Sequence, residues 1–405
     1  MDNQKKAAAC TIVSKNYIAY ARTLCASYLK HHPDNDFFVL LVDKNNGEID
    51  VSKELFKLIT VEELPIADFK SITFRFDVLE LNTNVKPAFL QYLFNQHKIY
   101  KIIYFDPDIY IYQPVTMIYS LLEDNNVVLT PHCTEPINDT LRPNERDFLK
   151  AGVFNLGFIA LQNSDESNKL LTWWGNRCLT LGYNETQSGL FVDQKWMNFA
   201  PCFVDKLYVL KHAGCNMAYW NLHERSLTKV NSEWIVNNKT PLLFFHFSGV
   251  DINNQDVVSK YQNRSTFDNR SDLREIFGEY FMRLEGNEIR ETRQYNYAFG
   301  TYSNGEKITS IARRIFSIKA EFHQGEDPFL VDSQFYKWAK QNQLLSTNDD
   351  SGKFNSNNYQ KNDWRIRIIN RGLKLTLKMF GADKYSMLMK YFSYISIFRN
   401  QRDLF

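Results

Sequence analysis

The chain has 405 residues, 44% of them hydrophobic, so it can bury one large core or two smaller ones and is not disordered throughout. Its formal net charge is only +2, which disfavours nucleic acid as the main partner, because binding phosphates calls for a strong basic excess. The six cysteines are scattered, without the close pairs of a zinc or redox motif, so we expect reduced thiols.

The N-terminal residues contain no apolar stretch long enough for a signal peptide or a membrane span, and we therefore expect a cytoplasmic protein. From there, short apolar runs alternate with amphipathic stretches, a pattern typical of βαβ units in an α/β fold. Strands are expected over 7–14, 36–43, 100–105, 127–132, 153–162, 206–211 and 241–249, and helices over 17–31, 83–97 and 169–181 and from 190. The stretch 51–59 is amphipathic.

Strand signals fade after about residue 254, and helical patterns follow over 272–290 and 329–341. A polar, low-complexity stretch over 346–362 has almost nothing to bury and predicts a flexible linker. We therefore divide the chain into an α/β domain (1–254), a helical extension (255–345), this linker, and a helical tail (363–405).

The tail is basic and amphipathic, with Asp383 and Asp403 as its only acids from Trp364 onward. Two interpretations remain open at this point. The tail is either a surface helix packing on its own domain or a segment in peripheral contact with an anionic membrane.

The segment KIIYFDPDIYIY carries the strongest chemical signal, because a buried strand ends in Asp106, Pro107 and Asp108. In extended backbone, residues two apart project to the same side, so both carboxylates can converge on one cation. Pro107 fixes its φ and stiffens the pair. Hard oxygen ligands favour Mn²⁺ or Mg²⁺, which can bridge the phosphates of a nucleotide diphosphate.

Two other interpretations compete for this segment. Two acids flanking a proline also occur in solvated turns, but here they directly follow a five-residue apolar run. Phosphatases of the haloacid dehalogenase type also place two aspartates after a buried strand. Those enzymes normally continue with Gly or Thr, whereas Ile109, Tyr110 and Ile111 follow here, which disfavours that class.

Up to about residue 250, the chain resembles the family-8 glycosyltransferases, whose GT-A fold is a Rossmann-like, mixed and mostly parallel sheet flanked by helices. TIVSKNYIAYARTLCASYL resembles that family's opening strand and helix, where the residue matching Tyr17 stacks on the uracil of the donor. YFDPDIYIY resembles its metal motif, which implies Asp106 and Asp108 as ligands. The resemblance implies that 1–254 is a nucleotide-sugar-binding catalytic domain, here followed by a helical C-terminal extension.

Three later blocks match in the same order. AGVFNLGFIAL resembles the strand whose polar groups lie near the donor sugar, which points to Asn155 and Gly157. VDQKWMN resembles a block beside the anomeric carbon, which makes Asp193 and Gln194 the catalytic candidates, with a lysine replacing that block's second acid. FFHFSG resembles the block that supplies the third metal ligand, which nominates His246, beside the donor-binding Gly249.

The chain departs from the family in two places. Ser14 and Lys15 stand in the opening loop where acids are usual, and no Lys-Pro-Trp follows His246. Lys86, at the start of a helix, could meet a donor phosphate with its ammonium group or be a solvated lysine. Possible acceptor contacts come from CNMAYWNLHER, whose residues could equally be core and capping groups: Asn216, Tyr219, Trp220, Asn221 and His223.

The resemblance implies transfer of a hexose from a UDP-sugar to a glycan or lipid-linked glycan, with retention, in the synthesis of a bacterial-type surface polysaccharide or glycoconjugate. Gln194 is a poor nucleophile, so we expect front-face attack, with the metal and Lys86 taking up the charge of the departing diphosphate. The alternatives are an inverting enzyme and a catalytically inactive GT-A-like subunit that binds in a glycan-assembly complex.

Overall fold

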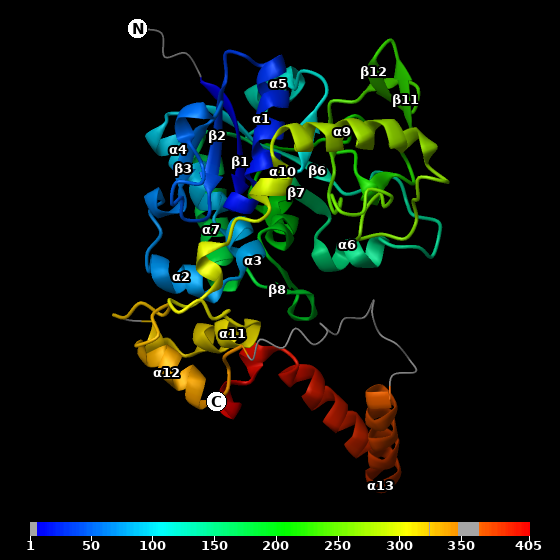
Figure 1. Cartoon of the computed structure of the whole chain (residues 1–405). Coiled ribbons are helices and arrows are strands. Elements are labelled where there is room, and N and C mark those ends of the chain that lie inside the picture. Colours follow the sequence, from blue (N-terminus) through cyan, green and yellow to red (C-terminus); the bar gives the residue numbers. More distant parts are fainter. Residues whose placement is uncertain (1–5, 324, 347–363) are drawn as a thin grey trace. The chain divides into compact units, whose positions relative to one another are not determined.

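The computed structural model describes residues 6–323, 325–346 and 364–405 (Figure 1). The chain forms two compact units, one of residues 1–69 and 78–298 and the other of residues 70–77 and 299–405. The boundaries expected at 254 and 345 stay predictions. The predicted linker over 346–362 lies, apart from its first residue, outside the described part of the chain.

The first unit is built on a seven-stranded sheet with the order β10-β6-β7-β4-β1-β2-β3. Neighbouring strands run parallel except at β7, which is antiparallel to both β4 and β6. This confirms the expected mixed, mostly parallel sheet. The strands are β1 (Ala7–Val13), β2 (Asp36–Leu41), β3 (Lys57–Thr60), β4 (Lys101–Phe105), β6 (Val127–Pro131), β7 (Phe154–Gln162) and β10 (Leu207–Val209).

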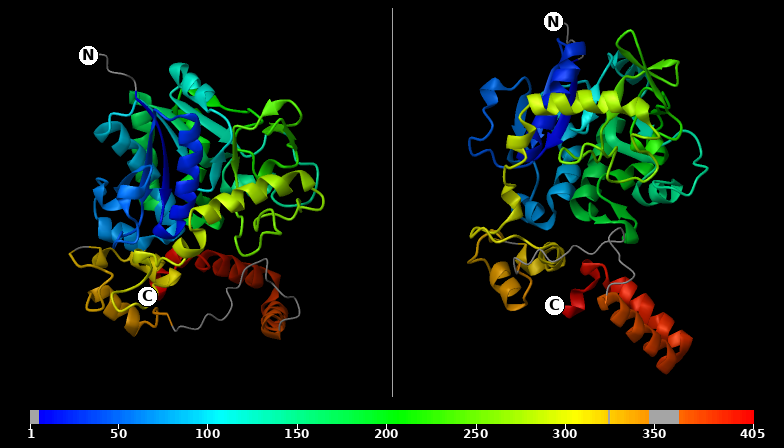
Figure 2. Two further views of the ribbon diagram at one scale, coloured as in Figure 1. Left: turned by 45° about the horizontal axis from the view of Figure 1, so that its top comes forward. Right: turned by 45° about the vertical axis from the view of Figure 1, so that its right-hand side comes forward.

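Helices cover both faces of this sheet, and Figures 1 and 2 show α1 and α4 on opposite sides of it. One face carries alternate strand residues such as Ile103 and Phe105, which pack with residues of α1 (Ile18–His31) and α5 (Thr116–Asp124). The other face carries Tyr104, whose ring lies under the ammonium group of Lys86 from α4 (Lys86–Gln96). α7 (Asp165–Leu181) packs beside α4. The sheet is therefore buried on both faces, as its continuous apolar strands predict.

Smaller elements complete the first unit. The amphipathic stretch 51–59 forms a 3-10 turn and the edge strand β3, and the segment from 190 forms a short strand and a 3-10 helix, Gln194–Phe199, instead of an α-helix. The other elements are α3 (Val78–Asn84), α6 (Glu145–Ala151), β8 (Asn184–Glu185), β9 (Leu190–Phe191), α8 (Ala200–Phe203), β11 (Leu227–Val230), β12 (Glu233–Val236), β13 (Thr240–Pro241), α9 (Arg274–Gly286) and α10 (Ile289–Thr292).

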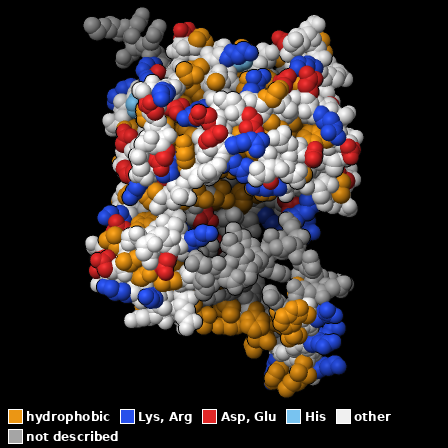
Figure 3. Space-filling view, in the orientation of Figure 1, with side chains coloured by type: hydrophobic (Ala, Val, Ile, Leu, Met, Phe, Trp, Pro, Cys, Tyr) orange, Lys and Arg blue, Asp and Glu red, His pale blue; other side chains and the backbone are white. Residues whose placement is uncertain are grey.

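The second unit is helical, as expected for the C-terminal region. It holds α2 (Phe69–Arg75) from its second residue, α11 (Ser310–Ile318) and α12 (Gln334–Gln341), around a core of aromatic side chains. The chain then forms α13 (Trp364–Ile395), which bends at Gly381, where φ is 78° and ψ is 172°. In Figure 3, hydrophobic and basic side chains gather on this helix. Among the described residues, no helix is long and apolar enough to cross a membrane.

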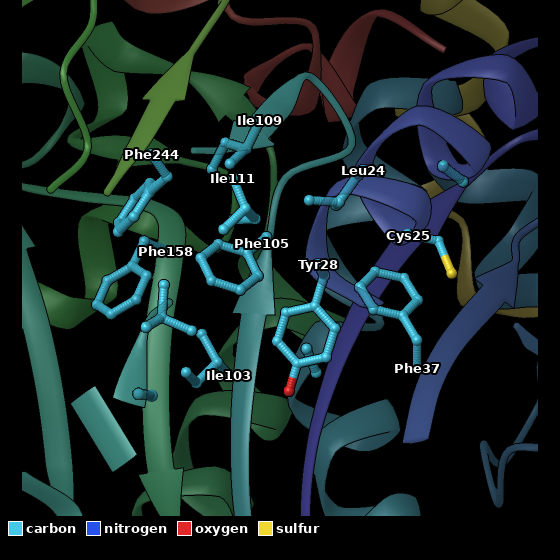
Figure 4. Close-up of a cluster of buried hydrophobic side chains, with 14 of the residues drawn as sticks. Leu24, Cys25, Tyr28, Phe37, Ile103, Phe105, Ile109, Ile111, Phe158 and Phe244 are labelled. Atoms are coloured by element: carbon cyan, nitrogen blue, oxygen red, sulfur yellow. The ribbon is translucent and has the colours of Figure 1, made fainter. Parts of the chain in front are cut away.

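A separate two-stranded ribbon positions the candidate site. β5 (Ile109–Ile111) pairs antiparallel with β14 (Phe244–His246), so that Ile109 lies opposite His246. Figure 4 shows Ile109, Ile111 and Phe244 within the same hydrophobic cluster as Phe105, the last residue of β4. The ribbon is therefore anchored in the core directly beyond the carboxyl end of β4.

Candidate functional site: two carboxylates and a buried histidine

Asp106 and Asp108 lie on either side of Pro107, between β4 and β5, and His246 ends β14. The Nε2 atom of His246 lies 2.9 Å from Oδ1 of Asp108 and 3.8 Å from Oδ2 of Asp106. One ligand atom from each residue falls within 4.8 Å of the others, a spacing that suits a single metal ion. The structure thus brings together the three ligands that the sequence nominates.

A chain of side-chain amides fixes the orientation of the His246 ring. The Nδ1–H group donates to Oδ1 of Asn216 (3.2 Å), so Nε2 is the nitrogen that faces the carboxylates. Nδ2 of Asn216 donates to Oδ1 of Asn155 (3.1 Å), whose own Nδ2 donates to Nε2 of His132 (3.4 Å). Outer partners of this kind set the tautomer of a metal-binding histidine and its direction.

Three further features show how closely the site is built. Asn216 adopts a left-handed backbone conformation, with φ 54°. A side chain at Gly157 would place its Cβ 2.3 Å from Cε1 of His246, so only glycine lets the ring approach β7. Trp220 packs edge-on against the same ring, at 5.0 Å between centroids. His246 is therefore held on several sides and is 2% exposed.

The charges of the site favour a cation. Burial lowers the pKa of His246, but the charges of Asp108 and Asp106 and the hydrogen bond to Asp108 outweigh burial, so the pKa lies above its usual value. The two carboxylates are partly exposed, and one imidazole faces both. Carboxylate oxygens with one imidazole form a donor set that suits Mn²⁺ or Mg²⁺, so the residues present fit the expected ion.

A second charged pair lies next to this cluster. The Nζ atom of Lys86 is 2.6 Å from Oδ2 of Asp193 and 4.0 Å from Oδ1 of Asp106, and it donates to the carbonyl of Leu156 (2.8 Å). Lys86 and Asp193 are each 1% exposed. Burial raises the pKa of the Asp193 carboxyl, while Lys86 acts in the opposite direction. Lys86 is thus ion-paired with Asp193, and it does not line the cavity that opens beside Asp106 and Asp108.

Gln194 is held by two backbone contacts. Its Oε1 accepts from the amide of Leu156 (3.0 Å) and its Nε2 donates to the carbonyl of Ala151 (3.2 Å). The residue before the Asp193–Gln194 pair, Val192, has φ 40°, which is unusual for a β-branched side chain. Strained backbone therefore sets the position of the two predicted catalytic residues.

A cavity of about 310 Å³ opens beside Asp106 and Asp108. Tyr17 lines it, is 45% exposed, and stacks on Tyr20 at 4.9 Å with an interplanar angle of 22°. Gly249, with φ 76°, lines the same cavity. An exposed aromatic ring and two carboxylates therefore share one cavity wall with the predicted donor-binding glycine.

Sequence reasoning missed several residues of this cavity, among them Lys260 and Tyr261. The amide of Lys260 donates to the carbonyl of Gly249 (3.0 Å), and this bond brings the lysine and the tyrosine back to the site after a loop. The ammonium group of Lys260 lies 5.1 Å above the Tyr261 ring. A lysine followed by an aromatic residue was the available signal, but its distance along the chain from His246 concealed it.

None of the five predicted acceptor residues lines the cavity. Asn221 accepts from the amide of Ala218 and donates to the carbonyls of His132 and Asn216, so it supports the turn that carries Asn216. Tyr219 lies 6.1 Å from Tyr261, between ring centroids. Trp220, as described, packs on His246, and His223 bonds the carbonyl of Glu135 through Nε2.

No family model matches the chain. It is similar to two uncharacterized proteins of Bacillus subtilis strain 168: YfnF, 25% identical over 60% of this chain and 81% of that protein, and YfnD, 24% identical over 59% and 76%.

Its structure is similar to solved structures of glycosyltransferases at low identity. The galactosyltransferase LgtC, in complex with donor and acceptor sugar analogs, shares 12% identity over 69% of this chain and 95% of that one, with a TM-score of 0.41. GlyE of Streptococcus pneumoniae TIGR4 shares 16% identity over 74% and 67%, also with a TM-score of 0.41. The bifunctional WbbM shares 12% identity over 73% and 53%, with a TM-score of 0.39.

Proposed function

We propose that the protein is a metal-dependent glycosyltransferase with a GT-A fold, similar to family 8, that transfers a hexose from a UDP-sugar to a glycan. The observation that carries the proposal is the convergence of Asp106, Asp108 and His246 on one point, at the wall of a cavity lined by an exposed tyrosine. Metal ligands and an aromatic platform in one cavity are what a nucleotide diphosphate needs.

Asp106, Asp108 and the Nε2 atom of His246 would hold a divalent ion, Mn²⁺ or Mg²⁺. When bound, this ion supplies positive charge to the two phosphates of the donor as the bond to the sugar breaks. Asn216 keeps the His246 ring in the tautomer and orientation that leave Nε2 directed at the carboxylates.

The donor would extend along the cavity from this ion. The exposed face of Tyr17 suits stacking by the uracil base, and Gly249 allows close approach of the chain. Lys260 lies on the same wall and offers an ammonium group to a phosphate oxygen. Lys86, proposed for that contact from the sequence, would act on the donor more indirectly, by balancing the charge of Asp193 beside Asp106.

Transfer with retention by front-face attack is the mechanism that these residues suit best. Asp193 is buried and ion-paired, and Gln194 is an amide, so neither is a ready nucleophile. The bond between the anomeric carbon and the phosphate oxygen breaks with its electron pair left on the diphosphate. The acceptor oxygen then bonds the anomeric carbon from the same face and gives its proton to the departing diphosphate oxygen. Asp193, Gln194, Asn155 and Gly157 are our candidates for the border of the sugar, and none of them lines the cavity itself.

We propose a glycan or lipid-linked glycan as the acceptor, at the cytoplasmic face of a membrane with which the C-terminal tail is in peripheral contact, in surface polysaccharide or glycoconjugate synthesis. Tyr219 is the best placed of the predicted acceptor contacts, because it lies beside Tyr261 at the cavity. Asn216, Trp220, Asn221 and His223 support the site through the contacts described above.

The test is hydrolysis and transfer of a panel of UDP-hexoses by the purified full chain, with Mn²⁺ and after chelation. We expect turnover that requires the metal and is lost in Asp106→Asn and Asp108→Asn. Asp34→Asn is the matched control, because Asp34 is exposed and does not line the cavity. Turnover that persists without metal, or a chain that binds neither Mn²⁺ nor any UDP-sugar, would refute the proposal.

The same experiment separates two alternatives. Lys195 replaces an acid of the family block and donates to the carbonyl of Leu149, which favours a catalytically inactive binding subunit as the second candidate. Such a subunit would bind Mn²⁺ and UDP together without consuming any donor. An inverting enzyme would consume the donor but give a product whose anomeric proton signal in NMR shows the opposite configuration.

A further inference from the structure

Charge is distributed unevenly along the chain. From residue 364 to the end there are nine Lys and Arg residues against two Asp residues, a net charge of +7. Because the whole chain carries only +2, the 363 residues before this segment carry −5. The C-terminal segment is therefore strongly basic, while the rest of the chain is acidic.

Within α13, the basic side chains form a stripe. Arg367, Arg371, Lys374 and Lys378 follow one another at spacings of four, three and four residues, which places them on one face of the helix. All four are exposed. No Asp or Glu occurs between residues 364 and 380, the arm of α13 before its bend at Gly381, so no acidic side chain of this arm neutralises the stripe.

An apolar surface adjoins the stripe. Ile368, Leu375 and Met379 follow at spacings of seven and four residues, and they are 56%, 58% and 65% exposed. Phe380 ends the arm and is 54% exposed. In Figure 3, hydrophobic and basic side chains lie side by side on this helix. Exposed apolar surface of this extent marks a binding surface, because folding alone would bury it.

The bend at Gly381 starts a second arm of different character. Its large exposed side chains are Met387, Tyr391, Phe392 and Tyr394. Tyrosine combines an apolar ring with a polar hydroxyl, which suits the boundary between lipid headgroups and acyl chains. The glycine conformation at the bend is one that other residues rarely adopt, so the two arms are set at an angle by the sequence itself.

We propose that α13 binds the surface of an anionic lipid bilayer and lies in the plane of the interface. The apolar side chains of both arms enter the headgroup and upper acyl region, while the stripe of Arg367, Arg371, Lys374 and Lys378 contacts anionic headgroups. The charge favours lipid over a second copy of the chain, because two copies meeting through this helix would bring two stripes of like charge together. This inference rests on the membrane contact of the proposed function, to which it assigns the residues and the kind of lipid, and neither metal nor donor takes part in the binding itself.

The experiment is co-sedimentation of the purified full chain with vesicles, either of neutral phosphatidylcholine or with about one third phosphatidylglycerol. We expect the chain to bind anionic vesicles and to bind neutral vesicles only weakly. Binding to anionic vesicles should weaken at high salt, because salt screens exposed charges. Replacing all four stripe residues with Gln should lower the affinity for anionic vesicles about 100-fold or more. The double variant Ile368→Ser and Met379→Ser should lower it about tenfold.

The matched control replaces four exposed lysines of the first unit with Gln: Lys150, Lys206, Lys211 and Lys239. It makes the same change in net charge and should leave vesicle binding unchanged. Equal binding to neutral and anionic vesicles, or an unchanged affinity of the stripe variant, would overturn the proposal. So would a wild-type dimer that ignores vesicles and dissociates in the Ile368→Ser and Met379→Ser variant. Donor hydrolysis without vesicles should be the same in all these variants, so the outcome is separate from that for the metal site.

Discussion

Two buried histidines lie at opposite ends of the chain of side-chain amides. They differ in the groups that each ring contacts besides its asparagine. His246 and His132 are 2% and 6% exposed, and each is bonded by an asparagine, Asn216 or Asn155. His246 faces two carboxylates and has a raised pKa. His132 stacks on Phe148, with centroids 4.9 Å apart, and burial lowers its pKa to about 4.

The comparison shows that burial alone does not distinguish a ligand from a structural residue. Both rings lost water, but only His246 lies against more negative charge than it can balance. A charge deficit next to a cavity marks a place for a cation. This deficit distinguishes His246, whereas packing does not, because Trp220 packs against its ring as Phe148 packs against that of His132. The hydrogen bonds run in one direction from His246 to His132, so the two rings keep fixed tautomers together.

Replacing each of the two histidines in a separate variant should give the largest difference in Mn²⁺ affinity. We expect His246→Gln to weaken Mn²⁺ binding at least about 100-fold, since a ligand is lost and loss of an outer partner alone costs about 10- to 100-fold. His132→Gln should keep most of the affinity. Titration with Mn²⁺ followed by electron paramagnetic resonance measures both. Similar losses in the two variants would remove the distinction.

Acid should act on His132, at the other end of the chain of amides. Because the pKa of His132 is about 4 in the folded chain and about 6.5 when unfolded, the unfolded state binds a proton that the folded state excludes between these values. Stability should therefore fall as the pH falls from about 6.5 to 4, with about 2 kcal/mol due to this residue. Urea unfolding at pH 7.5 and 4.5 measures the loss.

His132→Gln is the control for this measurement, because glutamine does not titrate. The variant should be less stable at pH 7.5 and should show a smaller loss between the two pH values. A loss as large as that of the wild type would place the acid sensitivity elsewhere.

Removing the side-chain amide of Asn216, which contacts the His246 ring, should weaken Mn²⁺ binding less than removing the ligand itself. Asn216→Ala removes the acceptor for Nδ1–H of His246, and we expect Mn²⁺ affinity to fall about tenfold. Asn216→Gly is the matched variant, because it also lacks the amide but relieves the left-handed conformation. It should lose metal affinity equally while unfolding at a higher temperature than Asn216→Ala. Full metal affinity in both variants would show that Asn216 only shapes the turn.

Replacing Tyr17 should have the smallest effect, and it should weaken only the binding of the donor. Tyr17→Leu should weaken binding of UDP about fivefold through lost stacking and leave Mn²⁺ affinity as it was. Isothermal calorimetry with UDP, in the presence of Mn²⁺, measures the first quantity. A parallel loss of metal affinity would mean that the cavity and the ligand cluster are one cooperative unit.

Much of this arrangement could be predicted from the sequence because it depends on local pattern. The buried strand before Asp106, the spacing of Asp106 and Asp108, and the apolar run before His246 are all visible in short windows. The structure places them together. The alternating apolar and amphipathic segments likewise predicted the α/β fold, and the resemblance to the family-8 glycosyltransferases implied that the sheet is mixed and mostly parallel.

The rest depends on contacts between distant parts of the chain. The buried role of Lys86 follows from its meeting Asp193, which no local pattern indicates. Lys260 reaches the cavity through one backbone hydrogen bond to Gly249, and His132 joins the amide chain only because β6 ends beside β7. The amphipathic stretch 51–59 forms a 3-10 turn and then β3, which becomes an edge strand by pairing with the distant β2.

The antiparallel pairing of β5 with β14 has a consequence for how the protein matures. It holds His246 opposite Ile109, so the third ligand comes from a segment synthesised long after the two aspartates. A nascent chain on the ribosome therefore carries both carboxylates without a complete chelate while residues 109–246 are being synthesised. Under the proposed function, capture of the ion would follow assembly of the sheet and would not guide it, in contrast to small zinc domains whose folding is driven by metal.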